Sequence, residues 1–392
     1  MFREFLPSSP QRPDLSPNRS WGKWGIACVV AAVALLQAGC GSFKKNKGED
    51  IGELDSSEPV GNTGSGSFVA LCQSLGESGS GAVVGKGGWL FSADELREIG
   101  KTGSVPAASR QEVIACITDY HDQLRKAGIE LIVVPIPQKA IIYAEKAGAK
   151  TSGRLDSYLQ DLYQELASKG VGVVDLVPDL RRERDTPGGV FPKTASHLSP
   201  KGAEVAASTI VGYAKNHEWA KGLEPDPNIV GTPMQITLLG NLAAYVRGDA
   251  PVEPETLPMR AISRRTVAGL TPAARAGDGK IILITSEQDG LAYGAPGSPA
   301  GYDADLRGSL ADQLIFELGT PVDVYSHATS GANTARVRLL RASMTKPAVL
   351  ENTAVIIWAF SASELTGPGW RKVPLNLEFR QSEETIDKDA GS

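Results

Sequence analysis

Short, wholly apolar stretches alternate with amphipathic stretches along most of the chain. The run IELIVVPIP, residues 129–137, is rich in β-branched side chains, which is typical of a buried parallel strand. Before it, apolar residues recur at helical spacing over residues 110–128, and Gly128 ends that pattern. The same alternation predicts further strands at 171–176, 280–285, 321–326 and 352–360, and further helices at 155–170, 201–216, 306–319 and 333–344.

This order of strands and helices predicts one α/β domain, with a mainly parallel sheet and helices on both faces. We place the domain at residues 81–377 and a polar tail at 378–392. A Pro- and Gly-rich stretch at 222–278 has mixed character and predicts no clear element. Because ligands of such sheets bind beyond the carboxyl ends of the strands, candidate site residues should follow strands.

The first 39 residues predict an export signal. Basic residues precede the apolar run 26–36, which is shorter than the roughly 20 residues that span a bilayer. The run ends in LLQAGC, which resembles a bacterial lipoprotein cleavage box and makes Cys40 the predicted site of lipidation. A plain signal peptide and an uncleaved N-terminal anchor are the alternatives. Residues 40–80, rich in Gly, Ser and charge, predict a flexible tether. Together these segments predict a periplasmic protein, lipid-anchored at the outer membrane.

Charge and cysteine content exclude some classes of function. The formal net charge is −5 and no basic stripe is visible, so nucleic-acid binding is not expected. No Cys/His cluster has metal-ligand spacing, and the sequence predicts no metal site and no cofactor. Apart from the signal and Cys40, the cysteines are Cys72 and Cys116. In an oxidising periplasm they are candidates for a disulfide, and two buried free thiols are the alternative.

One histidine has a suggestive position. His197 lies in VFPKTASHLSPKGAEVAA, two residues before a helix that Ser199 would cap and Pro200 would begin. The positive end of a helix dipole disfavours imidazolium, so a neutral His197 with a lone pair for a proton is expected there. A partly exposed loop histidine without chemistry is the alternative.

Several stretches in the same order resemble the alginate O-acetyltransferase group, whose catalytic domain has the SGNH-hydrolase fold. They are GKGGWLF with SADEL, VVPIPQKAIIY, FPKTASHLSPKGA, IILITSEQDG, and AVIIWAF with EL and GW. The resemblance covers about residues 81–375. It implies an SGNH-hydrolase-like α/β fold and acetyl transfer onto exported polysaccharides, with a Ser nucleophile, a His base and an orienting Asp. The resemblance places the base at His197.

The sequence departs from that group at the chemical positions. The Asp of the Asp-x-His segment is Ala195. With the apolar strand aligned without a gap, Gly-Asp-Ser becomes residues 285–287, which read Thr-Ser-Glu. The nucleophile position then holds Glu287, and Ser286 lies one residue early.

Two hypotheses follow, and they leave open whether the protein is an enzyme. In the first, a lipid-anchored member with a degenerate catalytic set binds an exported polysaccharide or a protein of the exopolysaccharide machinery. In the second, an active acetyltransferase or acetylesterase uses Ser286 and His197, with Asp185, Asp175 or Glu287 as a substitute acid.

Four further residues are candidates for contacts with substrate. Lys139 and Tyr143 follow the strand at 129–137, and the lysine could pair with an anionic sugar or acyl donor. Asn333 and Arg336 belong to a Gly/Ser/Asn-rich loop whose backbone N–H groups could hold an oxyanion. A solvated loop pair and an ordinary helix-capping loop are the respective alternatives.

Overall fold

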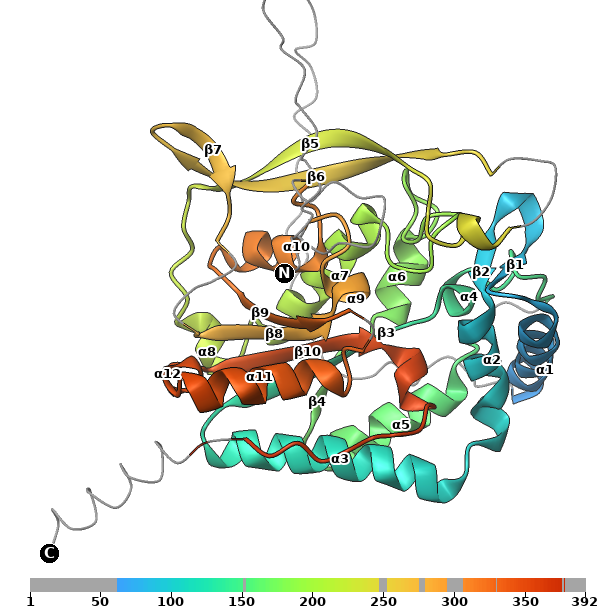
Figure 1. Ribbon diagram of the computed structural model, residues 1–392, viewed down its shortest axis with the longest axis horizontal. Helices are drawn as coiled ribbons and strands as arrows, with labels where there is room; N and C mark the ends of the chain where they lie inside the picture. The colour runs from blue at the N-terminus through green and yellow to red at the C-terminus, as the bar shows by residue number, and fades with distance from the viewer. Residues whose placement is uncertain are drawn as a thin grey trace, which may run out of the picture. The chain divides into compact units, whose positions relative to one another are not determined.

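The fold is known from a computed structural model (Figure 1), which describes residues 62–150, 153–246, 252–274, 279–294, 306–328, 330–375 and 377. The predicted export signal, the lipidation site Cys40 and the polar tail at 378–392 lie outside the described residues.

In the part of the chain that the structure describes, the central sheet has five strands, all paired in parallel. Their order is β4 (Gly172–Val173), β3 (Glu130–Ile136), β10 (Val355–Ser361), β8 (Ile281–Ser286) and β9 (Asp323–His327). The predicted strands and their parallel arrangement are thus confirmed, although β4 is much shorter than expected. Since every strand runs the same way, all the carboxyl ends meet at one edge.

Helices cover both faces of this sheet (Figure 1). Side chains of β8 alternate between two cores: Ile281 and Leu283 belong to one, Ile282 and Ile284 to the other. This is why the strands are apolar at every position rather than at alternate ones. The first core includes α7 (Pro200–Ala214) and α10 (Leu310–Leu318), and the second includes α3 (Ala107–Lys126), α5 (Ser157–Ser168) and α11 (Thr334–Thr345).

The predicted flexible tether is wrong for its last part. Helix α1 (Asn62–Ser78) packs against α2 (Ala93–Lys101), and the Phe68 side chain is only 1% exposed. Although the segment is rich in Gly and Ser, its apolar residues Phe68, Leu71, Cys72 and Leu75 recur at helical spacing. That periodicity, rather than the composition, decides the structure.

A second, antiparallel sheet forms in the stretch for which no element was predicted. Within the described residues it joins β5 (Ile229–Leu238), β6 (Glu255–Thr266) and β7 (Gly269–Pro272). Half of the ten residues of β5 are exposed and only two are buried, so most of the strand lacks the alternation of apolar residues that marks a half-buried strand. Toward its end, Ile236 and Leu238 pack with Met259 of β6 in a small separate core.

The two cysteines among the described residues are not paired. Cys72 and Cys116 are both free and buried, and they belong to different cores. Of the two alternatives that the sequence left open for Cys72 and Cys116, the structure has the two buried thiols. Burial raises the pKa of the Cys72 thiol to about 12, which keeps it unreactive.

The remaining elements are short and mostly connect the layers. None of the described helices is long and apolar enough to cross a membrane. The remaining strands and helices are β1 (Ala82–Val84), β2 (Leu90–Ser92), α4 (Lys139–Ile142), α6 (Val177–Glu183), α8 (Glu218–Lys221), α9 (Glu287–Gly290) and α12 (Ala348–Glu351), with 3-10 turns at Lys86–Gly88, Thr102–Ser104, Ala243–Tyr245 and Ala362–Leu365.

Candidate active site

His197 and Ser286 come to the same edge of the parallel sheet. Ser286 ends β8, and His197 lies on the loop before α7. Two contacts join that loop to the segment after β8. Gln288 Nε2 donates to Ser196 Oγ at 2.6 Å, and the rings of Tyr293 and His197 pack edge to face with centroids 5.3 Å apart. The segments that carry these two candidates, about ninety positions apart in the chain, are therefore in contact at this edge.

The Ser286 hydroxyl is engaged with Asp289. Its Oγ donates to Asp289 Oδ2 at 2.7 Å and accepts from Asp289 N at 2.9 Å, as the N-cap of α9. A hydroxyl has one proton to donate, so this proton points at a carboxylate and not at an imidazole. Asp289 Oδ2 also accepts from Ser361 N at 3.0 Å. Burial raises the pKa of Asp289, and the hydrogen bonds that its carboxylate accepts from the Ser286 hydroxyl and from Ser361 N oppose the rise.

The strand end belongs to Ser286 rather than to Glu287. Glu287 is the first residue of α9 and is half-buried. Ser286 is therefore the last residue of the strand, and Glu287 is the first residue of the helix that follows it. A serine followed three residues later by an acid is a helix-capping pattern, and this signal could have found Ser286 with Asp289. Sequence reasoning also missed Gln288 and Tyr293, which no local pattern marks.

His197 is held in one tautomer. Its Nδ1 lies 3.0 Å from the Leu198 carbonyl oxygen and 3.4 Å from the Tyr293 hydroxyl. Because a carbonyl can only accept, we infer that Nδ1 carries the proton and that Nε2 is the basic nitrogen. The ring is 3% exposed, and burial lowers its pKa to about 4, with a further lowering by the Lys139 charge. The neutral imidazole expected from the sequence agrees with the direction of this shift, and burial is its largest cause.

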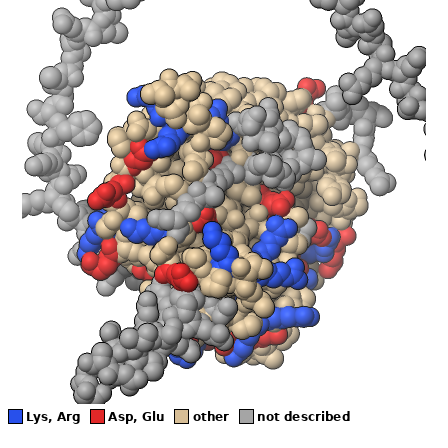
Figure 2. Space-filling view, turned by 60° about the vertical axis from the view of Figure 1, so that its left-hand side comes forward, with Lys and Arg blue, Asp and Glu red and all other residues tan. Residues whose placement is uncertain are grey.

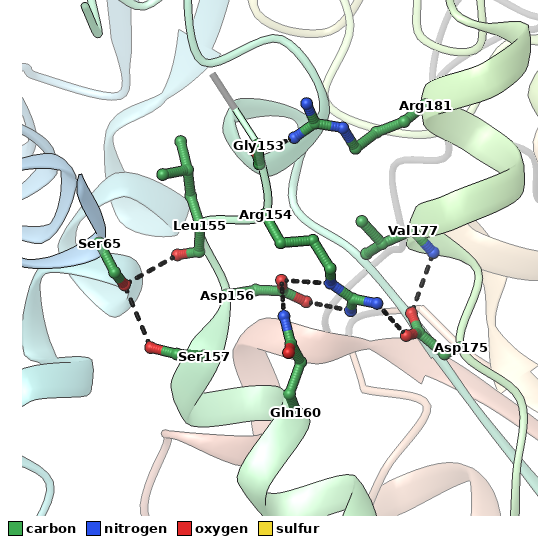
Figure 3. Close-up of polar contacts among 10 residues, drawn as sticks. All are labelled: Ser65, Gly153, Arg154, Leu155, Asp156, Ser157, Gln160, Asp175, Val177 and Arg181. Atoms are coloured by element: carbon green, nitrogen blue, oxygen red, sulfur yellow. Dashed lines mark hydrogen bonds and ion pairs between the residues drawn. The ribbon is translucent and has the colours of Figure 1, made fainter. Parts of the chain in front are cut away.

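Position 195 leaves this imidazole without the acid of the family pattern. Ala195 is buried, and Nδ1 meets a neutral carbonyl where a carboxylate would orient the ring. The proposed substitutes are engaged elsewhere or exposed. Figure 3 shows Asp175 paired with Arg154 and accepting from Val177 N, and the Asp185 side chain is 85% exposed.

The structure corrects the expected role of Lys139. The side chain is 0% exposed, and its Nζ donates to the carbonyl oxygens of Leu90 at 2.7 Å, Lys193 at 2.8 Å and Ala195 at 3.0 Å. Three acceptors use all three ammonium protons, although burial lowers the pKa of this group to about 7. Lys139 therefore cannot pair directly with a substrate. It ties the His197 loop to the start of β2.

Tyr143 and Arg336 are also buried, so direct contact with substrate does not fit either of them. The Tyr143 hydroxyl donates to Arg184 O at 2.8 Å and accepts from Val190 N at 3.0 Å, which fixes the start of the His197 loop. Arg336 Nη2 donates to Asn333 Oδ1 at 3.0 Å. Asn333 is half-buried and is the only one of the four candidates that reaches the surface. Its side-chain oxygen already accepts the hydrogen bond from Arg336.

The expected oxyanion-binding loop is occupied as well. The N–H groups of Gly331 and Ala332 donate to Glu364 Oε1 at 3.2 and 3.3 Å, and Ser330 Oγ donates to Glu364 Oε2 at 2.7 Å. Burial raises the pKa of Glu364 to about 7. An internal carboxyl group thus sits where a reacting oxygen was expected. Across the described ranges, no group of three or more His, Cys, Asp or Glu side chains could hold a metal ion.

Comparison with known proteins agrees with the family resemblance of the sequence. Residues 82–289 match the family described as SGNH hydrolase-like domain, acetyltransferase AlgX. A probable alginate O-acetylase AlgJ from Pseudomonas aeruginosa is 28% identical over 273 residues, 67% of each chain. Its Pseudomonas putida counterpart is 26% identical over 318 residues, 78% of this chain and 76% of that protein.

A solved structure supports the same fold. The O-acetyltransferase domain of Pseudomonas putida AlgJ superposes with a TM-score of 0.55 at 20% sequence identity, and the match covers 78% of this chain and 99% of that domain. The SGNH-hydrolase-like fold expected from the sequence is therefore confirmed.

Proposed function

The chain belongs to the AlgX family of SGNH hydrolase-like acetyltransferase domains, and from this premise we propose that it serves exopolysaccharide modification or export as a catalytically degenerate member that binds the polysaccharide. The match covers more than half of the chain, and the curated relatives are named as probable alginate O-acetylases. Those names support a polysaccharide as the ligand. A protein of the same machinery is the second kind of partner that this role allows.

The hydrogen bonds of Ser286 and His197 support the proposal that the catalytic set is degenerate. Acyl transfer requires the imidazole to take the serine proton, and the Ser286 proton is bonded to Asp289 instead. Since burial lowers the pKa of His197 to about 4, its Nε2 is a weak base. Ala195 cannot supply the carboxylate that stabilises imidazolium, and losing that acid from a complete triad costs about 10⁴-fold in kcat.

The N-terminal sequence supports the location. An apolar run ending in LLQAGC favours export to the periplasm and lipidation at Cys40, with retention at the outer membrane. Labelling with radioactive palmitate in the native host tests this part. We expect incorporation into the wild-type chain and none into Cys40→Ser, and equal labelling of both would overturn the anchor.

An active acetyltransferase or acetylesterase is the second candidate, and one observation favours it. His197 and Ser286 lie on segments in direct contact, and the imidazole is neutral. Rotation of the Ser286 side chain to another rotamer would release its proton from Asp289. In this alternative the hydroxyl attacks the acetyl carbonyl while Nε2 takes its proton, and the imidazolium then gives that proton to the ester oxygen as the bond between the acetyl carbon and the leaving alcohol breaks.

Release of p-nitrophenol from p-nitrophenyl acetate by the full-length chain separates the two candidates. For a degenerate member we expect wild type, Ser286→Ala and His197→Ala to release product at the same background rate. Hydrolysis that disappears in both variants would establish the active enzyme and overturn degeneracy. Circular dichroism of each variant confirms that the rates compare folded proteins.

A further inference from the structure

A pocket of about 210 Å³ lies between α1, the end of α2 and the start of α5. It is found beyond the carboxyl end of β3, because Gln138, two residues after that strand, forms part of its wall. Ligands of parallel sheets bind beyond the strand ends, so the position suits a binding site. We call this feature the α1–α5 pocket and define it by six of its lining residues: Ser65, Gly66, Ile99, Gln138, Leu155 and Ser157.

The α1–α5 pocket contains a buried amide that the protein does not satisfy. The Gln138 side chain is 2% exposed, and its Oε1 has no hydrogen-bond partner among the described residues. Gln138 is the N-cap residue of α4, but its side chain makes no capping hydrogen bond. A buried polar group without a partner is destabilising. A carboxamide has an acceptor beside a donor, so a ligand that offers a donor and an acceptor side by side complements it.

Hydrogen bonds hold the walls of the α1–α5 pocket together. Figure 3 shows the Ser65 hydroxyl of α1 between two groups at the start of α5. Ser65 Oγ lies 3.1 Å from Ser157 Oγ and donates to Leu155 O at 3.4 Å. The pocket is therefore shaped by contacts within the protein and needs no ligand to form.

The α1–α5 pocket offers no free charge. Charged side chains of both signs are spread over the face of the molecule in Figure 2. By contrast, of the described residues that line the pocket only Asp156 carries a charge, and its side chain is 0% exposed. Asp156 Oδ1 accepts from Arg154 Nε at 2.9 Å, and Oδ2 accepts from Arg154 Nη2 at 2.8 Å. A neutral ligand suits this lining better than an ion, whose charge would lose its hydration there.

The size and the apolar part of the lining limit the ligand further. An apolar cavity of about 150 Å³ binds benzene. The α1–α5 pocket, at about 210 Å³, therefore has room for a six-membered ring with one polar substituent. Apolar side chains supply the surface for such a ring, and they are Val69, Ile99, Ile141, Leu155 and Leu159.

We propose that the α1–α5 pocket binds a small neutral molecule that carries an amide group on an apolar ring. The amide pairs with the side chain of Gln138, and the ring packs against the apolar lining. This inference goes beyond the proposed function, because neither the polysaccharide nor the Ser286 hydroxyl enters the argument.

Isothermal titration of the full-length chain with benzamide tests the inference, and benzoate is the comparison ligand. The two probes have nearly the same shape, but benzoate is an anion. We expect benzamide to bind with a Kd on the order of 1 mM, as befits so small a ligand, and benzoate to bind at least about tenfold more weakly. Gln138→Leu removes the amide partner and should raise the Kd for benzamide about tenfold.

A second variant fills the α1–α5 pocket without touching Gln138. Gly66 is an exposed residue of α1, and a Cβ added there would meet no atom within 4 Å. Gly66→Leu therefore places a side chain at the pocket without a clash and favours the helix, so the fold should be kept. The matched control is Gly212→Leu, at an exposed glycine of α7 that also has open space around it. The Kd for benzamide should rise at least about tenfold in Gly66→Leu and less than about twofold in Gly212→Leu.

Three results would overturn the inference: no saturable binding of benzamide by wild type, equal affinity for benzamide and benzoate, or the same Kd in Gly66→Leu and Gly212→Leu. The first is the result for a pocket that holds only water. Circular dichroism of each variant confirms that folded proteins are compared. The proposed function is tested separately, since none of these titrations depends on Ser286 or His197.

Discussion

Two regions of the molecule differ in what their polar side chains bind. Around Ser286 and His197, the hydroxyl proton, the imidazole Nδ1 and the Lys139 ammonium all bind groups of the protein itself. Along α11, the guanidinium groups of Arg338 and Arg341 are exposed to solvent, and neither has a carboxylate partner among the described residues.

The contrast shows which region is prepared for an outside ligand. Polar groups that satisfy one another maintain a shape, and a substrate must displace their partners before it can bind them. Charges without partners are stabilised by a ligand that supplies the opposite charge. A buried cation such as Lys139 and an exposed one such as Arg341 therefore have different roles.

The largest effect is expected at the buried cation. Lys139→Met leaves three carbonyl oxygens without their donor and frees the His197 loop, so the free energy of unfolding should fall by about 3–4 kcal/mol. Lys193→Met, at an exposed side chain on the same loop, should change it by less than about 0.5 kcal/mol. Urea denaturation measures both. Similar losses of unfolding free energy in the two variants would mean that the hydrogen bonds of Lys139 do not stabilise the fold.

The next effect is on stability at low pH. The folded-state pKa of His197 is about 4, below the unfolded value of 6.5, so its contribution is present above pH 6.5 and is lost as the pH falls toward 4. Linkage gives a loss of about 3 kcal/mol by pH 4. The stability difference between wild type and His197→Gln should therefore shrink over this range in urea titrations. A constant difference would mean that the imidazole is not held neutral by burial.

Placing an acid at position 195 should raise the pKa of His197, a smaller effect than the two above. Ala195→Asp places a carboxylate in the His197 loop. An opposite charge within about 4–6 Å of an imidazole raises its pKa by about 1–3 units. NMR titration of the His197 ring measures the shift, and Ala195→Asn provides a control of similar size without charge. If both variants or neither shift the pKa, position 195 does not govern the imidazole.

The smallest effects separate the two residues at the end of β8. Ser286→Ala removes the N-cap of α9 and should cost about 1 kcal/mol of stability. Glu287→Gln alters a half-buried carboxylate and should cost less than about 0.5 kcal/mol. Thermal unfolding of both variants checks this order. A larger cost for Glu287→Gln than for Ser286→Ala would mean that the Ser286 side chain does not stabilise α9 as its N-cap.

Much of the fold could be predicted because its signals are local. The residues of β3, β8 and β10 are apolar on both sides of the sheet, so a short run of sequence reveals a buried parallel strand. Helix α1 carried its own periodic signal beneath a linker-like composition. The half-exposed β5 carried none, because its pairing partner β6 lies some twenty residues farther along the chain.

The positions of the candidate site residues in the fold could be predicted better than their contacts. His197 and Ser286 could be found because one precedes a capped helix and the other ends a buried strand. The burial of Lys139 could not be found, since its acceptors Leu90 and Ala195 come from segments about fifty residues away on either side. Whether a polar side chain serves the protein or a ligand depends on such long-range partners.

Intact-mass spectrometry of the full-length chain after incubation with p-nitrophenyl acetate tests the central contrast most directly. The Ser286 hydroxyl is committed to Asp289, so we predict that wild type gains no acetyl group beyond the level seen in Ser286→Ala. A stoichiometric acetyl adduct on Ser286 that is absent from Ser286→Ala would contradict this. Ser286 would then be a working nucleophile rather than a group satisfied within the protein.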